Sequence, residues 1–429
     1  MLMHAMIRQT AFLSGSHFLA RVIGFILRIW LSRELGAQAM GLVELAQSAQ
    51  MLLITPVVSG LPAAVSRMCA KTEPERQVRV LRCGMGLALA FSLPLTLAAF
   101  VLRTPLALWL GDIRTMPALL AYLPCIPVLG VSCALNGYYY GTGRPVPPAA
   151  SEILEQVIRL MLTMRLVSAL RGWPVMLRAA APAVAAMIGE TAALLMMLFI
   201  AARVLLAAQA EGSRRLILRE MIALALPLTG MRLVSSIMRT VQSVLIPARL
   251  QAAGLSASGA LGQLGIMNGM MMPVLLLPSF ITCSLSMVAA PELTRRQAQH
   301  RPQKRLVLRL LFAALWIGLL AMAAVWLLAP LFAGKLYRQP ELLPMLRRCC
   351  ALVPVMALSQ VASGLMNGLG LQKTSLHIAL LSSLISILTM YVLAAQPALR
   401  IWGVIIAFAA AQVVTLALSL RTLLRAVCS

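Results

Sequence analysis

The stretch SGSHFLARVIGFILRIWLS (residues 14–32) decides the fold, because it is long and apolar enough to cross a bilayer as a helix. It carries Arg21 and Arg28 in its interior. Seven residues are almost two helical turns, so both guanidinium groups lie on one helix face, about 10 Å apart along the axis, together with His17. An arginine at the bilayer centre costs from roughly 3 to more than 10 kcal/mol, so we expect this face to meet the interior of a helix bundle or a wet cavity rather than lipid.

A second pair of arginines with the same spacing occurs in the other half of the chain. RVIGFILR (residues 21–28) is matched by RLVSSIMR (residues 232–239), where Arg232, Ser236 and Arg239 share one face of an apolar helix. Isolated arginine pairs at corresponding places in two halves are not typical of side chains that merely reach for the membrane surface. We interpret the four arginines as the walls of one cationic cavity.

The composition is that of an integral membrane protein. Of the 429 residues, 61% are hydrophobic and only 11% are charged, and the mean hydropathy is +0.89. Long apolar runs indicate helices rather than a β-barrel. The net charge of +25 does not indicate a nucleic-acid partner, because the basic residues are scattered among apolar spans. No metal-ligand spacing, P-loop or acid–base pair outside the membrane is present, so we expect no cofactor, no metal and no enzymatic activity.

Breaks at glycine, proline and charged residues, among them Leu35–Gly36 and Arg301–Pro302, divide the chain into about twelve predicted transmembrane helices. They lie near residues 10–33, 42–68, 78–102, 117–140, 147–169, 180–207, 217–246, 261–289, 305–329, 342–369, 374–395 and 401–425. We expect two six-helix lobes, at residues 1–211 and 212–429, around a central cavity. More basic residues fall in the loops on the side of the N-terminus, which predicts that both termini are cytoplasmic.

Several other residues inside the predicted spans have more than one possible role, and the sequence does not decide between these roles. Pro56, Pro62, Pro273 and Pro278 kink the corresponding helices of the two halves, either for packing alone or to let the lobes bend as gates. Glu44 and Glu190 either pair with a cavity arginine, lie at the membrane surface, or bind a coupling proton or Na⁺. His17 either packs through a hydrogen bond or contacts the ligand.

The opening of the chain resembles a known family. RVIGFILRIWLSRELGAQAMGLVELAQSAQMLLITPVVSGLPAAVSRMCAK (residues 21–71) is similar to the start of stage V sporulation protein B-like polysaccharide-export flippases. These belong to the multidrug/oligosaccharidyl-lipid/polysaccharide (MOP) superfamily, with the MurJ-type lipid II flippases and the MATE transporters. The resemblance implies two six-helix lobes in a V, and Arg21 matches the first cavity arginine of lipid II flippases. The second would fall on Leu27, so Arg28 is its neighbour.

Taken together, the residues and the resemblance predict a flippase. The expected substrate is a lipid-linked oligosaccharide or peptidoglycan precursor whose anionic pyrophosphate is bound by Arg21, Arg28, Arg232, Arg239, Ser236 and His17, and which crosses to the outer leaflet by alternating access. The alternatives are a MATE-like exporter of small organic compounds coupled to H⁺ or Na⁺, and a non-transporting scaffold. We expect a monomer in the bacterial cytoplasmic membrane, in contact with membrane lipids and with cell-wall or spore-envelope synthesis proteins.

Overall fold

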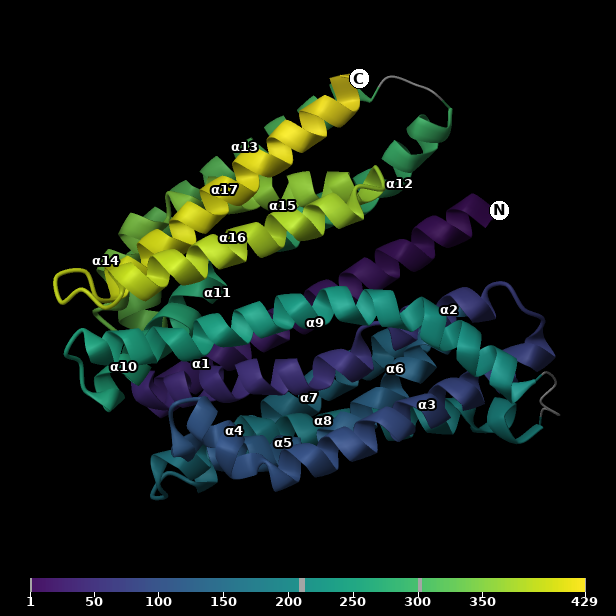
Figure 1. Cartoon of the computed structure of the whole chain (residues 1–429), viewed down its shortest axis with the longest axis horizontal. Helices are drawn as coiled ribbons and strands as arrows, with labels where there is room; N and C mark the ends of the chain where they lie inside the picture. The colour runs from purple at the N-terminus through teal and green to yellow at the C-terminus, as the bar shows by residue number, and fades with distance from the viewer. Residues whose placement is uncertain (1, 208–212, 300–302, 429) are drawn as a thin grey trace. The chain divides into compact units, whose positions relative to one another are not determined.

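The computed structural model describes residues 2–207, 213–299 and 303–428, which form helices and connecting turns without a strand (Figure 1). The elements of the first half are α1 (Leu2–Val58), α2 (Leu61–Cys69), α3 (Pro74–Val101), α4 (Arg103–Trp109), the 3-10 helix η1 (Ile113–Thr115), α5 (Met116–Tyr122), α6 (Cys125–Gly141), α7 (Val146–Ala169) and α8 (Val175–Ala207). They are followed by α9 (Arg214–Ala252), α10 (Ala257–Leu264), the π-helix η2 (Gly265–Met271), α11 (Met272–Leu275), α12 (Ser279–Ala298), α13 (Lys304–Pro330), the π-helix η3 (Leu331–Leu336), α14 (Leu342–Cys349), α15 (Leu352–Gly368), α16 (Gln372–Leu393) and α17 (Ile401–Cys428). The prediction of an all-α protein is confirmed.

The helices are long and apolar enough for a multi-pass membrane protein. Within the described ranges, seven helices meet this description, or ten if each of three bent helix pairs is one span. Two of the predicted spans merge in the single helix α1, and α7 falls short because it carries Glu152, Glu155, Arg159 and Arg165. The count of twelve spans therefore stays a prediction.

The break between the first two predicted spans lies at Gly36, as the sequence predicts. Gly36 has φ 77° and ψ 174°, a conformation that is essentially restricted to glycine, and α1 kinks there. A side chain at this position would force the kink into strained backbone geometry. One residue therefore turns a 57-residue helix into two segments with different neighbours.

The chain divides by packing into two units. The first comprises Met1–Leu27 and Leu42–Thr240, and the second comprises Arg28–Gly41 and Val241–Ser429. This division falls inside α9, because α9 continues as one helix past Thr240. The predicted lobe boundary at 211/212 lies outside the described residues, and so does the predicted break at Arg301–Pro302. The six-helix lobes at 1–211 and 212–429 stay a prediction.

Each unit has an apolar core of its own. In the first unit, α2, α3, α6, α8 and the start of α9 bury residues such as Leu81, Leu135, Met197 and Met221. In the second unit, α12, α13, α15 and α17 bury Leu293, Val361, Leu365 and Leu423, among others, and α16 packs against α17 (Figure 1). These cores hold the helices that carry the polar side chains discussed below.

Candidate functional site

On α1, His17 is paired with a carboxylate and stays partly exposed, so its contact with a ligand stays a prediction. The Nδ1 atom of His17 lies 2.6 Å from the Oε2 atom of Glu152 on α7, and both side chains are about one-third exposed. A residue further along α1, Gly24, lies beside the Gln156 side chain of α7. The polar face of α7 therefore lies along α1, and it includes a partner for His17 that the sequence analysis did not identify. Arg21, one turn after His17, is exposed.

The second predicted arginine pair lies on α9, with both guanidinium groups accessible. Arg232 and Arg239 are exposed, whereas Ser236 between them is buried at 4% exposure. Arg232 and Arg239 form no hydrogen bond to any residue within the described ranges. Below this face, the Thr240 hydroxyl donates to the Ser48 carbonyl of α1 at 3.0 Å. The sequence-predicted stripe thus consists of two accessible cations around a buried serine.

Arg28 belongs to the second unit and is bound to backbone there. Its Nε donates to the Gly269 carbonyl and its Nη2 to the Asn268 carbonyl, both at 3.2 Å. Both carbonyls lie in η2, a π-helix, which pairs its backbone groups five residues apart. Arg28 therefore satisfies two backbone oxygens, in addition to any role in binding a ligand that the sequence predicts.

We expect the replacement of Arg28 by alanine to destabilise the protein by about 1.5–3 kcal/mol, because two part-buried carbonyls lose a charged donor. Arg28→Lys should lose less, since an ammonium can still reach one of them. The measurement is the midpoint of thermal unfolding in detergent. Arg33→Ala is the matched control, because Arg33 is exposed on the same segment; equal midpoints for both alanine variants would contradict the assignment.

Glu190 lies in a partly buried polar cluster between α7 and α8. Glu155 and Arg159 of α7 form an ion pair, with Oε1 and Nη1 at 3.8 Å, and both interact electrostatically with Glu190 of α8. The helices meet closely because Gly189 has no side chain to hold them apart; a Cβ there would lie 3.0 Å from the Glu155 carbonyl. The cluster contains two carboxylates and one guanidinium, so one carboxylate has no cationic counterpart within it.

Beside this cluster the first unit has a small cavity of about 10 Å³. Its polar lining consists of Gln47, Gln50 and Arg159, and the buried Nε of Arg159 has no hydrogen-bond partner within the described part of the chain. A cavity of this volume holds roughly one water molecule. One water here would satisfy the unpaired donor.

The remaining candidates have well-defined places but untested roles. Pro56 ends α1 and Pro62 begins α2, on either side of the turn at Ser59–Gly60. Pro273 begins α11, and the buried Pro278 stands at a 54° bend between the α10–α11 segment and α12. Glu44 is half-buried on α1. Their roles as gates and coupling groups stay predictions, and so does the convergence of the four arginines on one cavity.

Comparison with known sequences identifies one matching family and a related sporulation protein. The polysaccharide biosynthesis protein family matches residues 6–297. Stage V sporulation protein B of Bacillus subtilis (strain 168) is 28% identical over 313 residues, a match that spans 69% of this chain and 60% of that protein.

Comparison with solved structures identifies the fold. The lipid II flippase MurJ in an inward closed conformation matches with a TM-score of 0.75 at 13% identity, over 97% of this chain and 90% of the other. An inward-facing multidrug resistance MATE family transporter of the MOP superfamily matches with a TM-score of 0.73 at 16% identity, over 95% of this chain and 93% of the other. At these identities the likeness shows a common fold, which agrees with the fold that the sequence predicts.

Proposed function

The chain belongs to the polysaccharide biosynthesis protein family, and from this membership we propose that it flips a lipid-linked glycan with an anionic pyrophosphate headgroup. The substrate class is a lipid-linked oligosaccharide or a lipid II-like peptidoglycan precursor. It moves from the cytoplasmic to the outer leaflet of the bacterial cytoplasmic membrane by alternating access, with both termini of the protein in the cytoplasm. The protein acts as a transporter and not as an enzyme.

The observation that carries the proposal is the pair of accessible arginines on α9. Arg232 and Arg239 lie in a helix that is long and apolar enough to span the membrane, yet both side chains are exposed. Contact with lipid would cost several kcal/mol for each of them, so they require water or an anion. Guanidinium groups bind phosphate oxygens through two parallel hydrogen bonds and stay charged at any physiological pH. A diphosphate is the anion that fits both properties.

Arg21 is the third arginine that we assign to the headgroup, and Arg28 positions the backbone of η2. His17 acts through Glu152, which holds its ring next to the Arg21 turn. A role in sporulation is suggested by the name of a similar protein, stage V sporulation protein B. We propose that this chain likewise supplies glycan precursors for an envelope layer, beside the enzymes that polymerise them.

The membrane potential supports export of such a headgroup. Moving an anion out of a negative cell interior is downhill by roughly 2.3 kcal/mol per charge per 100 mV. A diphosphate therefore gains free energy on leaving without any coupling ion. This term favours movement from the cytoplasmic to the outer leaflet, which is the direction that we propose.

One observation favours a second candidate, an exporter of small organic compounds coupled to H⁺ or Na⁺. The cluster of Glu155, Arg159 and Glu190 has one carboxylate in excess, and a partly buried carboxylate without a counter-charge in its cluster is a place for a proton or a monovalent cation. The same cluster can serve a flippase as a coupling site. The cluster therefore bears on whether transport is coupled to an ion, and it does not distinguish between the two substrate classes.

The test is translocation by the purified chain in proteoliposomes. The probe is a fluorescent polyprenyl diphosphate that carries one N-acetylhexosamine, and a membrane-impermeant reductant measures the fraction in the outer leaflet. We expect exchange between leaflets well above the protein-free rate, and faster exit when the interior is negative. A rate equal to that of protein-free liposomes refutes the proposal. Export of an organic cation driven by a proton or Na⁺ gradient, without lipid exchange, establishes the second candidate.

A further inference from the structure

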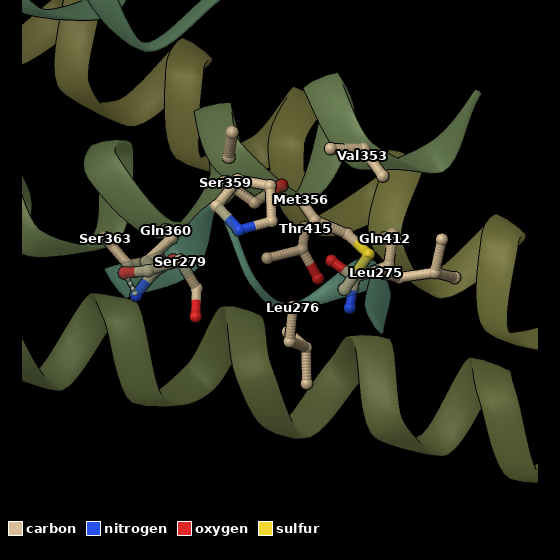
Figure 2. Close-up of a pocket in the computed structure, with 12 residues that line it drawn as sticks. Leu275, Leu276, Ser279, Val353, Met356, Ser359, Gln360, Ser363, Gln412 and Thr415 are labelled. Carbon is tan, nitrogen blue, oxygen red and sulfur yellow. Dashed lines mark hydrogen bonds between the residues drawn. The ribbon is translucent and has the colours of Figure 1, made fainter. Parts of the chain in front are cut away.

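The second unit contains a cavity of about 300 Å³ that neither the arginines nor the acidic cluster explains (Figure 2). It lies where the bend at Pro278 meets α15 and α17. Half of its lining is apolar, with Val353 and Met356 as examples. The other half consists of uncharged hydrogen-bonding side chains, which we call the serine–glutamine pocket: Ser279, Ser359, Gln360, Ser363, Gln412 and Thr415.

The bend and one close helix approach form the pocket. The helical axis turns by 54° between Leu275 and Ser279, so α12 leaves the direction of α11 and opens a space beside α15. Further along, α15 comes close to α12 at Gly364, where a Cβ would lie 2.5 Å from the Cβ of Ser286. The cavity is therefore a consequence of backbone geometry, not of missing side-chain volume.

Some of the polar groups of the pocket are held in place by the protein. The Thr282 hydroxyl donates to the Gln360 Oε1 at 2.9 Å, and the Gln360 Nε2 donates to the Ser279 carbonyl at 3.4 Å, the dashed line of Figure 2. The hydroxyls of Ser359 and Thr415 donate to carbonyls of their own helices, at 2.7 and 2.8 Å. Their oxygens still accept hydrogen bonds from a ligand.

Other groups of the pocket are unused. Ser363 and Gln412 form no hydrogen bond to any residue in the ranges that the structure describes. Gln412 and Thr415 are three residues apart on α17, and both line the pocket together with Met356 (Figure 2). A primary amide offers two donors and one acceptor, and a hydroxyl offers one donor and two acceptors. The pocket thus presents both donors and acceptors on different helices.

The chemistry of the lining determines the class of ligand. Among the residues that the structure describes, no charged side chain lines the cavity, so an anion or a cation would lose its hydration without gaining a counter-charge. Hydroxyl and amide groups that are withdrawn from water need hydrogen-bond partners, and a polar ligand can supply them. Groups that both donate and accept match sugar hydroxyls, and the apolar residues match the C–H faces of a sugar ring. The volume is at the lower end of the range for small-molecule sites, which fits one ring and excludes a long lipid tail.

We propose that the serine–glutamine pocket binds one neutral sugar ring of the lipid-linked glycan. This inference rests on the proposed function, and it assigns the recognition of sugar and of diphosphate to different residues. The arginines bind the charge that every lipid-linked diphosphate carries. The pocket distinguishes a glycosylated carrier from the bare carrier, so that the empty lipid does not compete for transport.

The test compares binding of two probes by the detergent-purified full chain. One probe is a polyprenyl diphosphate with a single N-acetylhexosamine, and the other is the same polyprenyl diphosphate without sugar. Gln412→Met keeps the side-chain length but removes every hydrogen bond of the amide. We expect it to weaken binding of the glycosylated probe about tenfold, as the loss of one to two hydrogen bonds implies, and to leave binding of the bare probe unchanged.

Two further variants keep the result interpretable. Thr415→Val is close in shape and should act in the same direction as Gln412→Met. Gln372→Met makes the same chemical change at an exposed position at the start of α16, away from the pocket, and should change neither affinity. Equal loss for both probes, or no loss for either, overturns the inference. If the wild-type chain binds neither probe, the proposed function itself fails and the inference fails with it.

Discussion

Arg239→Ala is expected to reduce translocation of the lipid-linked diphosphate at least thirtyfold, towards the rate of protein-free liposomes, without a loss of stability. Removing one partner from a desolvated pair of opposite charges costs about 2–5 kcal/mol, and the lower value already corresponds to about thirtyfold. Arg239 is exposed and bonds to no residue in the described ranges, so its removal leaves no hole and no unpaired group in the fold. The measurement is the leaflet-exchange assay in proteoliposomes, with thermal unfolding as the check on folding.

The design of the control matters because the chain carries many arginines besides the pair on α9. Arg219→Ala is matched to Arg239→Ala, since Arg219 is exposed on the same helix α9 but near its start. We expect it to exchange lipid at the wild-type rate. Arg239→Lys should keep part of the activity, because an ammonium retains the charge but loses the two parallel bonds. Wild-type exchange by Arg239→Ala would remove this arginine from the headgroup site.

The same assay shows whether Arg21 acts together with Arg239. If both bind one diphosphate, the double alanine variant should lose little more than the more severely affected single variant, since the diphosphate is no longer held once one arginine is gone. Strictly multiplicative losses would mean that the two arginines act at separate steps.

Local features of the fold follow from the sequence, whereas the division into units does not. Gly36 predicted a break between two apolar runs, and it lies there because its positive φ is accessible to glycine alone. The pairing of Glu155 with Arg159 follows in the same way from an i,i+4 spacing. That residues 28–41 pack with the second unit depends on contacts with residues more than two hundred positions away, such as Arg28 with Gly269. No local pattern in the sequence specifies such a contact.

The same distinction applies to the site. Charged residues in apolar spans are conspicuous, so Arg21, Arg232, Arg239 and Glu190 were candidates from the sequence alone. Glu152 was not assigned to His17, because the two are far apart in the chain and only the packing of α7 on α1 brings them together. The serine–glutamine pocket is even harder to predict from the sequence, since single serines, threonines and glutamines are common in membrane helices. It exists only because the bend at Pro278 brings residues 279, 359–363 and 412–415 together.

The second large effect is expected at the contact of α1 with η2. A Cβ added at Gly265 would overlap the Ala37 carbonyl oxygen and lie 2.7 Å from the Gly41 backbone nitrogen, and a Cβ at Gly41 would likewise overlap the Leu261 carbonyl. Backbone atoms of two packed helices cannot move aside as the end of a side chain can. Gly265→Val should therefore destabilise the second unit by about 3 kcal/mol or more, the upper range for overpacking.

The control for this contact is Gly262, which lies three residues before Gly265 and does not approach the backbone of α1 as closely. A Cβ at Gly262 would lie 3.8 Å from the Cβ of Ala37, which is an ordinary van der Waals distance. Gly262→Ala should leave the thermal midpoint unchanged or raise it slightly, because alanine is the better helix former by about 1 kcal/mol. Gly265→Ala should already lower the midpoint clearly, and Gly265→Val should lower it further.

Because residues 28–41 reach η2 through this contact and through Arg28, the combination of Gly265→Ala with Arg28→Ala should destabilise less than additively. If Gly265→Ala unfolds at the wild-type temperature, the backbones of α1 and η2 do not lie as close as the structure places them.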